Sequence, residues 1–290
     1  MNALVPRTRP GRPARRATIL PTLLMFVPCL YFLLPVFWLV VSATKSSEDL
    51  TTGFGLWFGD NNLRANLSAT LRYSDGLFLR WLANSALYSV VGAAVATLLA
   101  AMAGYALAKF RFRGRELVFS VVLTGVLVPP TALAVPLFLM LAGIGMTDTV
   151  WSVLLPSMVS PFGVYLARIY AAASVPDELL EAGRIDGAGD VRLFFQVGLR
   201  LMLPALVTIF LFQFVAIWNN FLLPLIMLAG DRLYPVTLGL YTLNSQITRD
   251  PDLKMVVVTG SLLSVVPLVA AFLLLQRFWR SGLSAGSVKA

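Results

Sequence analysis

The sequence predicts an all-α integral membrane protein with six transmembrane helices. Hydrophobic residues make up 58% of the 290 residues and charged residues only 13%, which is about half the charged share of a typical soluble domain. A helix needs about 20 consecutive apolar residues to cross a bilayer. Six runs meet that requirement, at residues 17–41, 82–107, 117–141, 150–170, 201–228 and 255–276.

The basic residues orient these helices. With both termini in the cytoplasm, sixteen of the 23 lysines and arginines fall on the cytoplasmic side, as the positive-inside rule requires. The first run shows no small-residue cleavage site before Lys45, so we interpret it as a retained helix rather than a signal peptide. The net charge of +9 is therefore explained by the orientation of the helices in the membrane. We expect the chain to contact membrane lipid and to bind no nucleic acid.

The predicted topology gives one transmembrane domain, residues 17–280, with short flanking segments. Residues 1–16 form a basic cytoplasmic leader, which we expect to lie near anionic lipid, and residues 281–290 form a cytoplasmic tail. The longest connection, residues 42–81, is polar and rich in turn residues, which favours a small extracytoplasmic cap. Residues 173–200 form a charged cytoplasmic loop between the fourth and fifth helices.

Proline recurs inside the predicted helices. Each proline removes a backbone donor and tends to kink its helix, and neighbouring helices or water must then satisfy the freed carbonyls. Kinked helices around a cavity are typical of a protein that changes shape. The prolines are Pro21, Pro28 and Pro35 in the first helix, Pro129, Pro130 and Pro136 in the third, Pro156 and Pro161 in the fourth, Pro204 and Pro224 in the fifth, and Pro267 in the sixth.

The one charged residue within the six runs is Arg168, at the cytoplasmic edge of the fourth. A proton-coupled transporter usually needs an ionisable relay inside the membrane, so that class is disfavoured, whereas a sodium-coupled transporter stays open. A path lined by amides, hydroxyls and an aromatic ring suits a neutral polyhydroxylated solute. Hydrogen bonding that only holds the helices together is the alternative for each such residue. The candidates for a solute path are Asn84, Tyr88, Gln213, Trp218, Asn219 and Asn220.

The composition excludes several kinds of chemistry. The chain has no histidine and one cysteine, Cys29, so it can build neither a thiolate metal cluster nor an internal disulfide. An intramembrane enzyme is disfavoured because paired intramembrane carboxylates are missing as well, and we expect no catalytic residue and no metal site. No lysine follows a glycine, so the Gly-Lys pair of a phosphate-binding loop is absent. The energy for transport would therefore come from a separate ATPase.

The charged loop carries the signals of a short helix. The run Ser174-Val175-Pro176-Asp177 has capping-box spacing and a proline in the first turn, and both favour a helix start. Leu179, Ala182 and Gly183 share one face at helical spacing, and Gly187 is a suitable C-terminal stop. A short helix with an apolar and small-residue face can lie across the membrane surface and fit a groove on a partner.

The run from Glu181 to Ala188 reads Glu-Ala-Gly-Arg-Ile-Asp-Gly-Ala, with Phe194 and Pro204 following it. This pattern resembles the EAA loop in permease subunits of bacterial ABC importers. Further stretches resemble the carbohydrate branch of that family, the subunits similar to the smaller maltose permease. These are Asn84-Ser85, Gly104 to Arg115, Pro129-Pro130, Val135 to Leu139, Trp218 to Phe221 and Gly282 to Lys289.

The resemblance implies the type I fold of ABC importer permeases and a subunit that moves a sugar or related polyhydroxylated solute into the cell. A polyol, glycerol phosphate or an oligosaccharide is an alternative solute. The implied partners are a second permease, two cytoplasmic ATPase subunits and an extracytoplasmic solute-binding protein, all at the bacterial inner membrane. The chain itself would bind no cofactor, because ATP and Mg²⁺ belong to the ATPase. The implied coupling residues are Glu181, Ala182, Gly183, Asp186, Gly187 and Ala188.

Three positions depart from the family pattern. Gly183 replaces an alanine, at a cost of about 1 kcal/mol in helix propensity, and we expect its smaller size to permit closer docking. Arg200 stands where the first proline of a pair is usual, so we expect a straighter entry to the fifth helix. Asn220 replaces a glutamate, which leaves that position uncharged.

Overall fold

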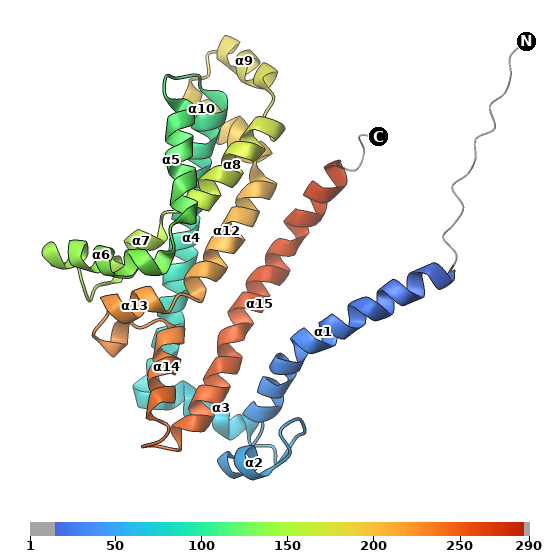
Figure 1. Cartoon of the computed structure of the whole chain (residues 1–290), viewed down its shortest axis with the longest axis vertical. Coiled ribbons are helices and arrows are strands. Elements are labelled where there is room, and N and C mark those ends of the chain that lie inside the picture. Colours follow the sequence, from blue (N-terminus) through green and yellow to red (C-terminus); the bar gives the residue numbers. More distant parts are fainter. Residues whose placement is uncertain (1–14, 287–290) are drawn as a thin grey trace, which may run out of the picture. The chain divides into compact units, whose positions relative to one another are not determined.

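The computed structural model describes the backbone of residues 15–286 and the side chains of residues 23–278. Residues 1–14 of the predicted leader and residues 287–290 of the predicted tail lie outside the described residues. The chain divides into two compact units, Met1–Arg64 and Ala65–Ala290. Each regular segment within residues 15–286 is helical, which confirms the all-α class (Figure 1).

The first unit contains α1 (Arg15–Ala43) and α2 (Ser47–Thr52). Helix α1 runs through its prolines without a break. Its side chains from residue 23 to residue 38 are all exposed and almost all apolar, as expected of a helix that is solvated by lipid tails. The part Leu23–Ala43 is long and apolar enough to cross a membrane.

The second unit holds the remaining helices, and α3 begins at the boundary between the units. In chain order they are α3 (Leu63–Arg72), η1 (Tyr73–Gly76), α4 (Leu77–Lys109), α5 (Arg115–Leu127), α6 (Pro130–Gly143), α7 (Val150–Ser157), α8 (Pro161–Ser174), α9 (Asp177–Ile185), α10 (Asp190–Leu193), η2 (Phe194–Gly198), α11 (Leu199–Leu201), α12 (Leu203–Trp218), α13 (Leu222–Met227), η3 (Asp231–Leu233), α14 (Val236–Gln246) and α15 (Leu253–Gly286).

Four stretches within the described residues are long and apolar enough to cross a membrane: Leu23–Ala43, Leu63–Lys109, Val150–Ser174 and Leu253–Phe278. Two bent helix pairs raise the number to six if each pair is one span. Helix α5 meets α6 at 102°, and the segment of α10 and α11 meets α12 at 80°. These helices are compatible with the six crossings that the sequence predicts.

The third predicted helix, residues 117–141, is not one straight helix. Helix α5 ends at Leu127, and α6 begins at Pro130. Neither Pro129 nor Pro130 has an N–H with which to continue the hydrogen bonds of α5. Val128 precedes a proline and is extended, with φ −76° and ψ 120°. The two prolines therefore turn the chain sharply in the middle of an apolar run.

The fifth predicted helix, residues 201–228, is also divided. Helix α12 ends at Trp218, and α13 follows as a separate short helix. The Asn220 side-chain oxygen accepts from the Leu223 N–H at 3.4 Å, and the Asn220 carbonyl accepts from the Thr237 hydroxyl at 3.1 Å. Asparagine offers the backbone such local alternatives to helical hydrogen bonds, which accounts for the break.

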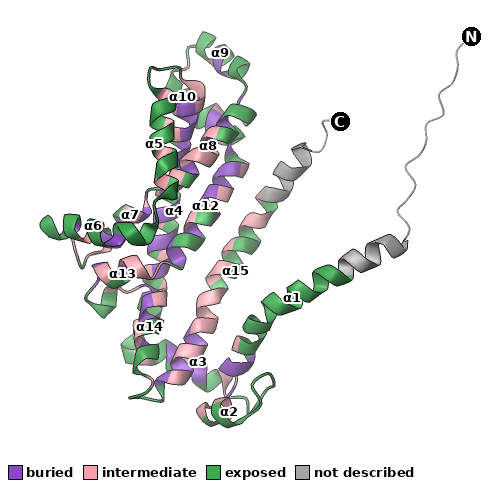
Figure 2. Ribbon diagram, viewed as in Figure 1, coloured by how far each residue is buried: buried purple, intermediate pink, exposed green. Residues whose placement is uncertain are grey.

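Helix α4 is the centre of the second unit and packs most extensively on α8 and α12. Small residues allow α4 and α8 to approach closely, because a Cβ on Gly104 would lie 2.5 Å from the Ala167 Cβ. Ala100 and Ala171 are almost completely buried. Such contacts stabilise helix pairs in a membrane, where lipid tails remove the hydrophobic driving force. Figure 2 shows α5 and α6, in contrast, as largely exposed.

Candidate functional site

Helix α9 lies where the sequence predicts a short helix in the charged loop. Its first turn holds Asp177 and Glu178, and carboxylates there interact favourably with the positive end of the helix dipole. The predicted capping box is wrong, because α8 continues to Ser174 and the Ser174 hydroxyl donates to the Tyr170 carbonyl at 2.6 Å. Pro176 is therefore the N-cap, and it has no side chain that can cap α9.

Gly187 ends α9 in a Schellman motif, as the sequence predicts. The Ala188 N–H donates to the Gly183 carbonyl at 2.9 Å, and the Gly187 N–H donates to the Arg184 carbonyl at 3.0 Å. These two bonds satisfy carbonyls that the end of the helix would leave free. Gly187 has φ +80°, a conformation that residues with a Cβ rarely adopt. The predicted coupling residues thus form one short helix and the turn that ends it.

Gly183 contacts the neighbouring short helix of the same chain. A Cβ on Gly183 would lie 2.4 Å from Leu193 Cδ2, and Leu193 is 3% exposed. Arg184 and Asp190 form an ion pair at 3.1 Å between the same two helices. The small size of Gly183 therefore permits α10 to pack against α9, and its effect on docking of a partner stays a prediction.

One side of α9 is buried and the other is open. Leu180 is 3% exposed, whereas Leu179 and Ile185 are 49% and 87% exposed. Glu181 and Ala182 are exposed as well, and Figure 2 shows most of α9 as exposed. The helix is held through its inner side and presents a mixed apolar and acidic surface outward.

An ion pair and aromatic packing connect α9 and the residues after it to the end of α4. Lys109 Nζ lies 2.8 Å from Asp177 Oδ1, and the hydrogen bond from Lys109 lowers the pKa of Asp177. Tyr105 of α4 packs on Phe194, with 5.1 Å between the ring centroids. A Cβ on Gly198 would lie 2.8 Å from the same tyrosine ring. The end of α4 thus contacts both the first residue of α9 and the segment that follows α10.

The segment that leads into α12 is bent, so the expectation based on Arg200 is wrong. The π-helical turn η2 is followed by a turn of 80° next to Met202, before α12 begins. Pro204 lies in the first turn of α12 and has no N–H to donate to the carbonyl four residues earlier. One proline together with the π-turn is thus sufficient for the bend, and π-turns are frequent at functional sites.

Asn84 and Tyr88 lie on one face of α4 with Trp81 and Ser85, and all four bond to the backbone of residues 231–236. Asn84 Nδ2 donates to two carbonyls of that segment at 2.9 and 3.0 Å. The Tyr88 hydroxyl and Trp81 Nε1 donate to two others at 3.0 and 2.8 Å. Ser85 Oγ accepts from a backbone N–H of the segment at 2.7 Å. We call these four side chains the α4 polar row.

Sequence reasoning missed Trp81 and Asp148, and it singled out Ser85 only in the Asn84-Ser85 stretch and not as a candidate for the solute path. The two α4 residues could have been found, because the polar row has the i, i+3, i+4, i+7 spacing of one helix face. Asp148 lies in the connection between α6 and α7 and accepts from the Ala229 and Gly230 N–H groups at 2.9 and 3.0 Å. These two bonds lower its pKa. No sequence pattern connects Asp148 with such distant residues.

The remaining candidates for a solute path belong to α12 and the residues that follow it. Gln213 Nε2 donates to the Ser157 carbonyl at 3.1 Å, and Asn219 Nδ2 donates to the Val215 carbonyl at 2.9 Å. Trp218 is 2% exposed. The structure thus gives the polar candidates partners within the chain, as it does for Asn84 and Tyr88. Their contact with a solute stays a prediction.

Residues 96–284 match the family model described as the binding-protein-dependent transport system inner membrane component. The chain belongs to this family. The matched part includes α9 and α12 and begins after the α4 polar row. The protein is therefore a multi-pass membrane subunit of an ABC importer, and its relatives are transport permeases rather than enzymes.

Three relatives illustrate the family. The arabinooligosaccharides transport system permease protein AraQ of Halalkalibacterium halodurans is 34% identical over 87% of this chain and 88% of that protein. The lactose transport system permease protein LacG of Rhizobium radiobacter is 30% identical over 88% of this chain and 90% of that protein. The diacetylchitobiose uptake system permease protein NgcG of Streptomyces coelicolor is 29% identical over 95% of this chain and 90% of that protein.

One solved structure has the same fold. A chain in the crystal structure of a bacterial ABC transporter involved in the import of the acidic polysaccharide alginate aligns with a TM-score of 0.79. The alignment covers 94% of this chain and 99% of that chain, at 23% sequence identity. The predicted ABC importer permease fold is thereby confirmed.

Proposed function

We propose that this permease forms part of a membrane pore that carries a sugar or related polyhydroxylated solute into a bacterial cell. The three relatives named above support a sugar, since each is named for the transport of a saccharide. The amides and hydroxyls along α4 and α12 would suit such a solute, and to bind it they would have to exchange their present bonds to the chain for bonds to the solute. A polyol or glycerol phosphate is the alternative.

We infer that α9 couples the pore to a separate ATPase, which would bind ATP and Mg²⁺. The observation that carries this inference is the exposed outer side of α9 on a helix whose inner side is fixed to the chain. Leu179 and Ile185 supply apolar contact area, and Glu181 supplies charge. The ion pair of Lys109 with Asp177 would transmit the movement of the docked helix to α4. The turn at Gly187 and Ala188 would fix the orientation of α9.

The remaining assignments rest on the distribution of charge and on the family. We propose cytoplasmic termini, because that orientation satisfies the positive-inside rule. Residues 42–81 would then be extracytoplasmic, and residues 173–200 would face the ATPase. A second permease subunit would complete the pore, and an extracytoplasmic solute-binding protein would deliver the solute.

Replacement of Glu181 tests the coupling. In cells that express the full importer, Glu181→Lys should reduce uptake of labelled sugar to near background, because it reverses charge on the exposed side of α9. Insertion into the membrane should be unchanged, as measured by the amount of folded protein in membrane extracts. Asp252→Lys is the matched control, since Asp252 is also an exposed carboxylate and lies in the connection that precedes α15. Normal uptake by the Glu181 variant would exclude the proposed coupling role.

The class of solute can be tested separately. Uptake of a labelled saccharide should be inhibited by excess unlabelled arabinooligosaccharide, lactose or diacetylchitobiose if the importer takes saccharides. Inhibition by a polyol or by glycerol phosphate, and not by these saccharides, would favour the alternative. This measurement does not depend on which residues of the chain contact the solute.

A further inference from the structure

The connection between α4 and α5 is short, and its length limits how far it can extend beyond the two helix ends. Helix α4 ends at Lys109 and α5 begins at Arg115, and both helices belong to apolar stretches that can cross a membrane. The connecting residues, 110–114, have a contour length of at most about 18 Å, so they can extend about 9 Å beyond the helix ends. The headgroup layer is about 5 to 8 Å thick on each side of a bilayer. With Lys109 and Arg115 at the edge of the hydrocarbon core, the connection would therefore lie among the lipid headgroups.

This connection carries positive charge that is only partly offset by the described residues, since Asp177 interacts with Arg111 through its charge without forming an ion pair with it. Arg111 and Arg113 are exposed and form no ion pair with any residue that the structure describes. Arg115 and Arg168, in contrast, share the Glu116 carboxylate, with N–O distances of 3.0 and 2.7 Å. The acidic group nearest in sequence is thus already paired, and two guanidinium groups stay available to an external anion.

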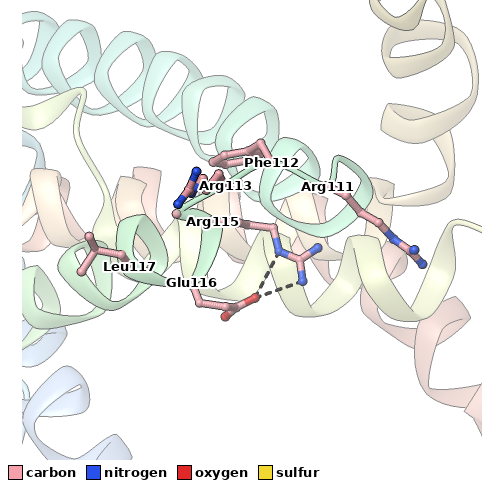
Figure 3. A pocket seen from close by; sticks show the side chains of 7 residues that line it. Arg111, Phe112, Arg113, Arg115, Glu116 and Leu117 are labelled. Carbon is pink, nitrogen blue, oxygen red and sulfur yellow. Dashed lines mark hydrogen bonds and ion pairs between the residues drawn. The ribbon is translucent and has the colours of Figure 1, made fainter.

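The arginines border a surface pocket of about 530 Å³ that also contains apolar side chains. Phe112 and Leu117 line it and are 46% and 69% exposed. Figure 3 shows Arg111 and Arg115 extending to one side of the turn and Arg113 to the other, with Phe112 between them. Along α5, Val121 is 65% exposed and extends the apolar surface beyond the arginines. The ligand that fits combines an anionic group with an apolar chain.

We propose that the turn between α4 and α5 binds the phosphate groups of anionic phospholipids through Arg111 and Arg113. Guanidinium groups donate paired hydrogen bonds to phosphate oxygens, and basic side chains next to a membrane span are attracted to anionic lipid. Phe112 and Leu117 would contact the part of the lipid where the headgroup meets the acyl chains. These apolar contacts favour a lipid, because inorganic phosphate would leave both side chains in water.

A bound lipid would act close to the coupling helix. Arg111 is two residues from Lys109, which forms the ion pair with Asp177 at the start of α9. Lipid phosphate on Arg111 would restrict the end of α4 in the position that holds this ion pair. The proposal does not depend on which solute the importer carries or on the role of Glu181.

A tryptophan placed in the turn can report the identity of the neighbouring lipid. The importer with its partner subunits is reconstituted in nanodiscs of phosphatidylcholine and phosphatidylglycerol, and the fluorescence of a Phe112→Trp variant is compared with that of the unchanged chain. Brominated phosphatidylglycerol should quench the added signal more strongly than brominated phosphatidylcholine at equal mole fraction. Arg111→Gln and Arg113→Gln should each lower this preference about 5-fold. Arg249→Gln, an exposed arginine between α14 and α15, should leave it unchanged.

Lipid analysis provides a measurement that does not rely on the tryptophan. Phosphatidylglycerol retained through detergent purification should fall in the Arg111→Gln, Arg113→Gln double variant relative to Arg249→Gln. Equal quenching by the two brominated lipids, or equal retention in both variants, would overturn the proposal. Loss of the preference on addition of inorganic phosphate would identify a general phosphate site instead. Stronger quenching by brominated phosphatidylglycerol only after removal of the ATPase would show that the ATPase covers these arginines. That result would also overturn the proposal.

Discussion

Gly183 packs closely on Leu193, and this contact accounts for glycine at a position where the EAA-loop pattern described above has alanine. A Cβ at residue 183 would overlap the Leu193 side chain, which is buried. Overpacking of this kind costs about 1 to 3 kcal/mol, whereas alanine would gain about 1 kcal/mol in helix propensity. The balance favours glycine as long as Leu193 occupies its present position.

Gly183→Ala should therefore destabilise the protein by about 1 kcal/mol, measured as a lower midpoint of thermal unfolding of the purified importer. Leu193→Val in the same chain removes one carbon from the contact and should recover part of the loss. Gly189→Ala is the control, because a Cβ there would contact nothing within 4 Å. Equal effects of the Gly183 and Gly189 substitutions would contradict the explanation.

Asp148 should give the protein a stabilisation that disappears in acid. Hydrogen bonds from Gly230 and Ala229 lower the pKa of Asp148 in the folded protein. A lowered pKa contributes stability that is fully present above the unfolded-state pKa of about 4 and is lost as pH falls through the folded-state value. The difference in thermal midpoint between the unchanged protein and Asp148→Asn should be constant near neutral pH and narrow below about pH 4. A difference that stays constant down to pH 3 would show that the charge of Asp148 does not contribute.

The four side chains of the α4 polar row together hold residues 231–236 against one face of α4. Replacement of Ser85 tests this role. Ser85 accepts from the N–H of Val236, which is completely buried. Ser85→Ala would leave this donor without its partner, at a cost of about 1 to 3 kcal/mol. The midpoint of thermal unfolding of the purified importer should therefore be lower in Ser85→Ala. Hydrogen exchange of the Val236 amide should be faster.

Ser89→Ala, one turn further along α4, is the matched control for Ser85→Ala. The Ser89 hydroxyl donates to a carbonyl of its own helix, so its removal leaves no buried N–H without a partner and should destabilise the protein less than Ser85→Ala does. If both serine variants are equally stable, the polar row does not hold residues 231–236 in place.

Sequence reasoning located whole helices where the chain stays helical past its prolines and asparagines, as at Pro28 in α1, Asn84 in α4 and Pro267 in α15. The predicted range 82–107 lies inside α4, whereas the predicted ranges 117–141 and 201–228 are each divided. Hydrophobicity alone does not show whether prolines bend a run or break it, since the outcome depends on what satisfies the free carbonyls. The break next to Asn220 depends on Thr237, which no local pattern indicates.

The sequence predicted the coupling helix α9 better than it predicted the solute path. The helix and glycine stop of α9 depend on neighbours in the sequence, and both are found where the sequence predicts them. The solute path depends on contacts between distant segments, and the sequence could not show that the Asn84 side chain bonds to backbone carbonyls near residue 233. Local signals therefore identify the partner-facing helix better than they identify the solute-facing side chains.

Helix α4 joins the two ends of the permease mechanically. It has 33 residues without proline, so it is about 50 Å long. One end carries the Lys109 contact to α9 and the other carries the polar row. If a helix of this length moves as one rigid rod, a tilt of about 5° displaces one end by about 4 Å relative to the other. Under the coupling role proposed for α9, a small rocking of that helix would displace the opposite end of α4 by several ångströms.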